Sequence, residues 1–107
     1  MTPFENRAEQ SALIRRAAAD MKIRNMSSRT IDTYTYQLSR FEDFLKGLDK
    51  HPAEATPEEI REYQLMLIEV KKLGWSSFNQ AVCSLRFLYR YTRPREWHVA
   101  MIPFGKK

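Results

Sequence analysis

The sequence has 107 residues, of which 43% are hydrophobic and 29% charged, and its net charge is +5. A chain of this length forms one domain with one core, and no apolar run approaches the roughly 20 residues of a membrane span, so we expect no membrane partner. The start lacks the pattern of a signal peptide, and the single cysteine, Cys83, cannot form an internal disulfide, so we expect a cytoplasmic protein.

Two helices are predicted in the first half of the chain, after a polar lead-in over residues 1–10. Apolar residues at helical spacing predict the first helix over residues 11–24. The second begins after Ser27 or Ser28, either of which can accept a hydrogen bond from a free backbone N–H, and it ends at Gly47 or in the polar segment that follows. Its inner face repeats at alternating steps of three and four residues: Ile31, Tyr34, Leu38, Phe41, Leu45 and Leu48.

The third predicted helix has the clearest start in the sequence. Thr56 can cap it, Pro57 suits the first helical position, and Glu59 can complete a capping box with Thr56. We expect Gly74 to end this helix, because glycine commonly follows the last helical residue. The predicted inner face consists of Ile60, Tyr63, Leu67 and Val70.

A fourth helix is predicted to begin after Trp75 with Ser76 as its cap and to end before Pro94. Its inner face consists of Phe78, Ala81, Val82, Leu85, Leu88 and Tyr89. The tail over residues 94–107 is predicted to be extended, with Trp97 and Ile102 as residues that could dock. We therefore expect an all-α domain over residues 11–93, without strands, followed by a basic linker.

The positive charge is concentrated in the last third of the chain. Residues 1–70 have a net charge of −2, whereas residues 71–107 have a net charge of +7. Such an asymmetry favours a polyanionic partner, nucleic acid before an anionic membrane. The alternative at this point is a basic surface that serves only solubility.

No set of residues predicts catalysis, a metal or a cofactor. His51 and His98 lie far apart and outside any cluster with the spacing of metal ligands, and both are interpreted as surface histidines. Cys83 is interpreted as a structural thiol within a helix. The three glycines fall between predicted helices and cannot build a phosphate-binding loop.

Two helix starts combine polar side chains with free backbone N–H groups, which is the chemistry that holds a phosphate. One is at residues 27–30 and the other at residues 76–80, and Arg86, Arg90 and Arg93 extend the second as a basic strip. In the alternative interpretation the serines are only caps and the arginines are only solvated. A helix-turn-helix formed by the third and fourth helices also fits these observations.

Four blocks of the sequence resemble one known family in order and spacing. They begin with Asn25-Met26-Ser27-Ser28-Arg29-Thr30-Ile31, Thr56-Pro57-Glu58-Glu59-Ile60, Trp75-Ser76-Ser77-Phe78-Asn79 and Ile102-Pro103-Phe104-Gly105-Lys106-Lys107. Together they resemble the SAM-like N-terminal core-binding domain of tyrosine recombinases, the phage-integrase family. Two positions depart from the family, which often has threonine in place of Phe78 and glycine and proline near Met26 and Ser28.

The resemblance implies two crossed helical hairpins that clamp double-stranded DNA at a recombination site, with the second and fourth helices toward the DNA. For Tyr34, packing in the core competes with a phosphate contact, because its position belongs to the core repeat. The DNA contacts implied by the helix starts and the resemblance together are Ser27, Ser28, Arg29, Thr30, Tyr34, Ser77, Asn79, Gln80, Ser84, Arg86, Arg90, Arg93, Lys106 and Lys107.

The resemblance also implies a division of labour. The family's tyrosine nucleophile belongs to a C-terminal catalytic domain, so none of the five tyrosines is expected to be catalytic, and this chain is expected to be a fragment of a bacterial or phage recombinase. Its partners would be DNA and that catalytic domain, and by itself it would be a monomer. The alternatives are a dimeric helix-turn-helix regulator and a helical protein-interaction module.

Overall fold

The computed structural model describes residues 11–97 and 99–105, and no strand occurs in these residues. The α-helices are α1 (Ala12–Ile23), α2 (Ser28–Lys46), α3 (Pro57–Glu69) and α4 (Trp75–Phe87). Two 3₁₀ turns, η2 (Pro52–Glu54) and η4 (Val99–Met101), and one π-helical turn, η3 (Leu88–Thr92), complete the described part. The all-α prediction is confirmed.

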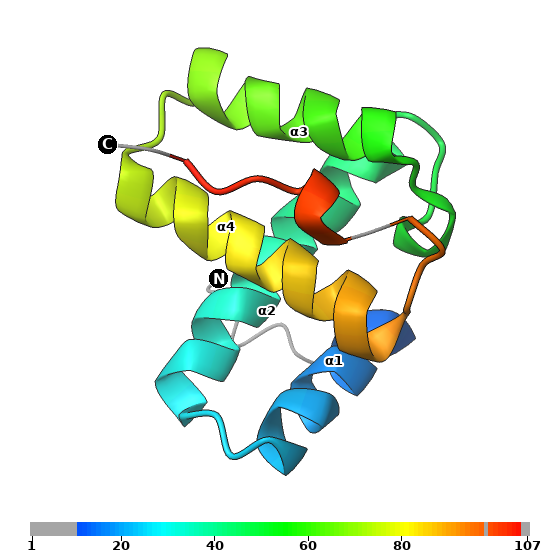
Figure 1. Ribbon diagram of the computed structural model, residues 1–107, viewed down its shortest axis with the longest axis vertical. Helices are drawn as coiled ribbons and strands as arrows, with labels where there is room; N and C mark the ends of the chain where they lie inside the picture. The colour runs from blue at the N-terminus through cyan, green and yellow to red at the C-terminus, as the bar shows by residue number, and fades with distance from the viewer. Residues whose placement is uncertain (1–10, 98, 106–107) are drawn as a thin grey trace.

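The helices form two hairpins, α1–α2 and α3–α4, and α4 passes across α2 (Figure 1). The helix α2 packs against both α1 and α4, and η3 packs against α1. Phe41 lies at the centre of the core, with ring centroids 5.0 Å from Tyr63 and 6.4 Å from Tyr89. The hydroxyl of Tyr89 donates a 2.7 Å hydrogen bond to the carbonyl of Pro52, which holds the segment before α3 against this core.

Three helix starts have side-chain caps, of which the sequence predicted Thr56 and, as one of two candidates, Ser27. Ser11 accepts from the N–H of Ile14 and Ser27 from that of Thr30, at 3.2 and 3.1 Å. Thr56 and Glu59 form the predicted capping box. Each cap bond joins a side chain to a backbone N–H only three residues further along the chain. Such short-range bonds can be read from the sequence, which explains why sequence alone located these starts.

The connection between α3 and α4 differs from the prediction. The helix α3 ends at Glu69, and Lys72, with φ of 53°, provides the left-handed residue that Gly74 was expected to supply. Gly74 has φ of −68° and is instead the N-cap of α4, which begins at Trp75. The predictions that Gly74 ends α3 and that Ser76 caps α4 are therefore wrong.

Two residues assigned to the inner faces of helices are exposed, Leu48 by 44% and Val70 by 71%. Both lie just beyond the last residue of their helix, so the helical spacing that would have directed them inward no longer applies there. The other predicted inner residues of α3 and α4 are buried, and those of α2 are buried except Tyr34, which is half-buried against the core.

The tail forms a strap, defined as residues 102–105, that runs between α3 and α4 (Figure 1). Ile102 is 1% exposed, and the carbonyl of Pro103 accepts a 3.0 Å hydrogen bond from Gln64 of α3. A Cβ at Gly105 would lie 2.5 Å from the ring of Trp75, so only glycine fits there. The tail therefore docks on the domain at Ile102. The prediction of an extended tail is wrong over residues 99–101, because these residues form η4.

Candidate nucleic-acid interface

The start of α2 exposes Ser27, Ser28 and Arg29, whereas Thr30 is half-buried. The hydroxyl of Ser27 is already engaged, since it accepts from the N–H of Thr30 and donates to the hydroxyl of Thr30 at 2.9 Å. The first backbone bond of α2 runs from the N–H of Ile31 to the carbonyl of Ser27, at 2.9 Å, so the N–H groups of Ser28 and Arg29 precede the helical ladder and point out of the helix end. This start offers two N–H groups, one hydroxyl and one guanidinium to a ligand.

The start of α4 is more open, because Gly74 has no side chain and no side-chain cap bond is present. The first bond of the helix runs from the N–H of Phe78 to the carbonyl of Gly74, at 3.0 Å. The N–H groups of Trp75, Ser76 and Ser77 therefore precede the helical ladder, and all three residues are exposed. Three donors at the positive end of a helix dipole are well suited to a phosphate.

Several predicted contacts on α4 have internal partners. Asn79 accepts a 2.7 Å hydrogen bond from the N–H of Gly105, and Arg86 donates to the carbonyl of Ile102 at 3.0 Å. Ser84 is fully buried and donates to the carbonyl of Ala81 at 2.7 Å. The expected groove contact by Ser84 is therefore wrong, because its position on the helix faces the core. Gln80 is exposed and accessible.

A groove of about 270 Å³ separates the start of α2 from the second half of α4 and the tail. We call it the aromatic groove, and its lining is Met26, Tyr34, Cys83, Arg86, Phe87, Arg90, Tyr91, Val99 and Phe104. Burial and, secondarily, a hydrogen bond with Cys83 raise the pKa of Tyr34 to about 12. Tyr34 thus presents a neutral hydroxyl at physiological pH, and its ring packs against the core.

Arginines lie over aromatic rings on this side of the molecule. The guanidinium of Arg24 is 4.1 Å from the ring centroid of Tyr91, that of Arg86 is 4.7 Å from Phe104, and that of Arg90 is 5.5 Å from Tyr91. Sequence reasoning missed the roles of Arg24, Tyr91 and Phe104. No local signal indicates them, because Arg24 meets Tyr91, and Arg86 meets Phe104, only in the folded chain.

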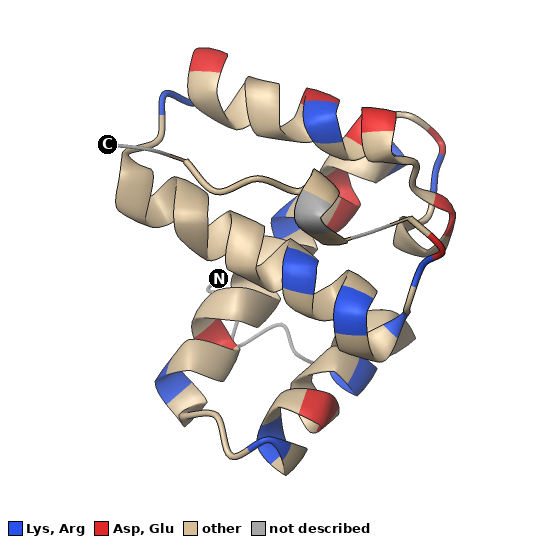
Figure 2. Ribbon diagram, viewed as in Figure 1, with Lys and Arg blue, Asp and Glu red and all other residues tan. Residues whose placement is uncertain are grey.

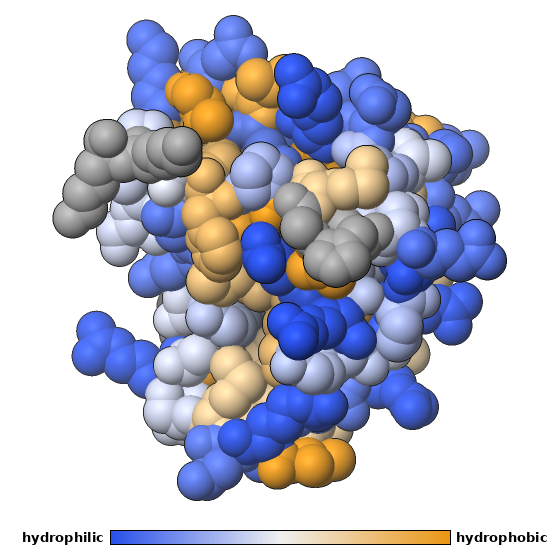
Figure 3. Space-filling view, viewed as in Figure 1, coloured by the Kyte–Doolittle hydropathy of each residue, from blue (hydrophilic) through white to orange (hydrophobic). Residues whose placement is uncertain are grey.

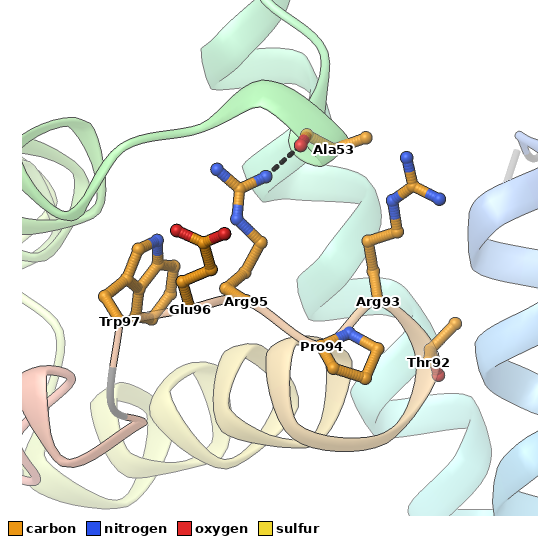
Figure 4. Close-up of a pocket in the computed structure, with 7 residues that line it drawn as sticks. All are labelled: Ala53, Thr92, Arg93, Pro94, Arg95, Glu96 and Trp97. Carbon is orange, nitrogen blue, oxygen red and sulfur yellow. Dashed lines mark hydrogen bonds between the residues drawn. The ribbon is translucent and has the colours of Figure 1, made fainter.

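Arg93 does not continue the strip of Arg86 and Arg90. The π-helical turn η3 precedes it, and the N–H of Arg93 bonds to the carbonyl of Leu88, five residues back, at 2.7 Å. Arg93 lines a separate hollow of about 460 Å³ together with Arg95, whose guanidinium donates to the carbonyl of Ala53 (Figure 4). The predicted strip is therefore divided between two depressions.

Charge is distributed unevenly over the surface. Figure 2 shows acidic residues along α3 and basic residues on the second half of α4, on η3 and at the end of α1. The helix α3 contains four glutamates and one arginine. Figure 3 shows the face of the molecule on which α4 lies, where strongly hydrophilic side chains are next to apolar ones. An anionic ligand is thus favoured at α4 and disfavoured along α3.

Residues 13–99 match the family described as phage integrase, N-terminal SAM-like domain. The chain belongs to this family. It is 36% identical over 96 residues to y4qK of Sinorhizobium fredii, a protein named as an integrase/recombinase, and 35% identical over 69 residues to the tyrosine recombinase XerC of Treponema denticola. No solved structure is significantly similar to it.

The integrase-family domain corresponds to only part of these relatives. The two matches cover 89% and 64% of this chain but only 30% and 22% of the relatives' own lengths. None of the helices in the described residues has the length and apolar character to cross a membrane. His98, Lys106 and Lys107 lie outside the described residues, so the predictions made for them stay predictions.

Proposed function

We propose that this integrase-family domain binds double-stranded DNA at a recombination site, as the core-binding part of a site-specific tyrosine recombinase or integrase. The main support is the start of α4, where three exposed residues present backbone N–H groups without a side-chain cap. The two relatives, one named as an integrase/recombinase and one as a tyrosine recombinase, support the same assignment.

In this proposal each part of the interface has its own role. Ser77 and the first turn of α4 hold one phosphate, and Ser28 with Arg29 holds another. Gln80, which is exposed on α4, reaches toward the groove of the duplex, and Arg90, which is exposed directly after α4, binds a phosphate. Lys106 and Lys107 follow the DNA backbone, and strand cleavage belongs to a catalytic domain elsewhere in the parent protein.

The test is an NMR shift titration of the labelled chain with a short duplex, together with affinity measured at several salt concentrations. We expect shifts at residues 27–34 and 75–90, and a log–log salt slope of about −4 to −5 if roughly five phosphates are neutralised. Arg90→Gln should weaken binding and reduce the slope by about 1. Arg61→Gln is the matched control, because Arg61 is exposed on the acidic helix α3.

A flat salt dependence would contradict DNA binding and favour the protein-interaction alternative. Equal affinity of the Arg90→Gln variant and the parent chain would contradict only the role of Arg90. We further propose that the chain is a monomer in isolation, which sedimentation would check. A dimer that binds a palindromic site would instead support the helix-turn-helix regulator.

A further inference from the structure

The aromatic groove combines flat rings with positive charge. Tyr91 and Phe104 are 42% and 47% exposed, and both line the groove near Arg86 and Arg90. Among the described residues, the lining contains these two arginines and no aspartate or glutamate. A matching ligand therefore has a flat apolar face and a negative charge next to it.

The arginines are already positioned for such a ligand. Arg86 lies over the ring of Phe104 and is held by its hydrogen bond to the carbonyl of Ile102, and Arg90 lies near the ring of Tyr91. A guanidinium held over a ring loses less conformational freedom when it binds an anion, and its plane can itself stack on a base. A simple anion would not use the rings, and an apolar peptide would leave the arginines unpaired.

The size of the groove limits what it can hold. Its volume of about 270 Å³ lies just below the roughly 300–1,000 Å³ typical of sites for drug-sized ligands. Bases within a duplex have their faces covered by their neighbours, so a base can reach the rings of this groove only after it has left the stack. The groove thus selects a base that has left the stack, as aromatic platforms for single-stranded nucleic acid do.

We propose that the aromatic groove binds one unstacked base of the DNA against Tyr91 and Phe104, with the phosphates beside that base bound by Arg86 and Arg90. This inference rests on the proposed function, because it needs a chain that binds DNA. The groove lies between the start of α2 and the second half of α4. A base that enters it would therefore come from DNA that is already held at the starts of α2 and α4.

The experiment compares fluorescence-anisotropy affinities for a perfect duplex and for the same duplex with one unpaired adenine. We expect the bulged duplex to bind about tenfold more tightly, which corresponds to one stacked base. The fluorescence of 2-aminopurine placed at the bulge should fall on binding. In a Tyr91→Leu/Phe104→Leu double variant, which keeps apolar bulk at two exposed sites, the preference for the bulge should disappear.

The matched control is Tyr36→Leu, since Tyr36 also lies near an arginine, Arg40 at 5.7 Å, but is not part of the groove. This variant should keep the preference for the bulge, and circular dichroism would show that all variants are folded. Equal affinity for bulged and perfect duplexes, with the perfect duplex still bound, would overturn this inference and leave the proposed function intact. Absence of binding to both duplexes would overturn the proposed function as well.

Discussion

The starts of α2 and α4 look alike in sequence, since each has a serine pair, but the folded chain treats them differently. At α2 the hydroxyl of Ser27 accepts from the N–H of Thr30 and satisfies the helix end internally. At α4 the residue before the helix is Gly74, and both serines belong to the first turn. A serine pair therefore indicates a helix start, but its register decides whether the start is capped or open to a ligand.

The two helix starts also contribute differently to the stability of the domain and to the binding of a ligand. A capped start contributes to the stability of the helix, whereas an uncapped start leaves its N–H groups to water or to an anion. Figure 2 shows the basic residues of α4 in the second half of the helix, away from this start, so the three N–H groups and the helix dipole provide the attraction for a phosphate here. We therefore expect α4 to dominate DNA affinity and α2 to show the larger stability effects.

The largest expected effect concerns DNA binding. Ser77→Glu places a carboxylate in the first turn of α4 and should weaken duplex affinity by about tenfold or more at low salt, through repulsion of the bound phosphate. Ser28→Glu at the equivalent turn of α2 should weaken it only about two- to threefold, since fewer donors are open there. Anisotropy measurements would compare the two, and a larger loss for Ser28→Glu would reverse our ranking. Neither variant should be less stable, because an acid suits a helix N-terminus.

A smaller effect is expected on the stability of the domain. Ser27→Ala removes the cap of α2 and should lower the free energy of unfolding by about 1 kcal/mol. Gly74→Ser supplies a cap to α4 and should raise it by only about 0.3 kcal/mol; a Cβ at Gly74 meets no atom within 4 Å, and φ of −68° suits serine. Urea denaturation would measure both changes. A loss of stability in Gly74→Ser would show that the open start of α4 is required by the fold.

The smallest effect involves Tyr34 of α2, which lines the aromatic groove together with Cys83 of α4. Its pKa is raised from 10.0 to about 12 by burial first, so between these values the unfolded chain has lost this proton while the folded chain still holds it. The contribution of this shift to the free energy of unfolding is thus fully present below pH 10 and is lost as the pH rises toward 12. Tyr34→Phe should make the free energy of unfolding, measured by denaturation between pH 10 and pH 12, less dependent on pH, and an unchanged dependence would contradict this assignment.

The sequence could predict those parts of the candidate site that depend on one helix alone, but not those that depend on how the helices pack. Ser28, Arg29, Ser77 and Gln80 were predicted as DNA contacts, which stays a prediction, and all four are exposed, as such a contact requires. Ser84 was wrong because its position had been judged by residue type and not by the side of α4 that faces α2. Arg93 left the predicted strip because a π-helical turn precedes it, which the spacing of apolar residues does not reveal.

The sequence by itself determined the four helices, two of their caps and most of the core, because these depend on residues three or four positions apart. Only the tertiary structure decided the strap and the aromatic groove. The strap is held by hydrogen bonds between residues 16, 26 and 39 positions apart in the chain, and no local pattern encodes such pairs. The groove exists because the start of α2, the second half of α4 and this strap converge in the folded domain.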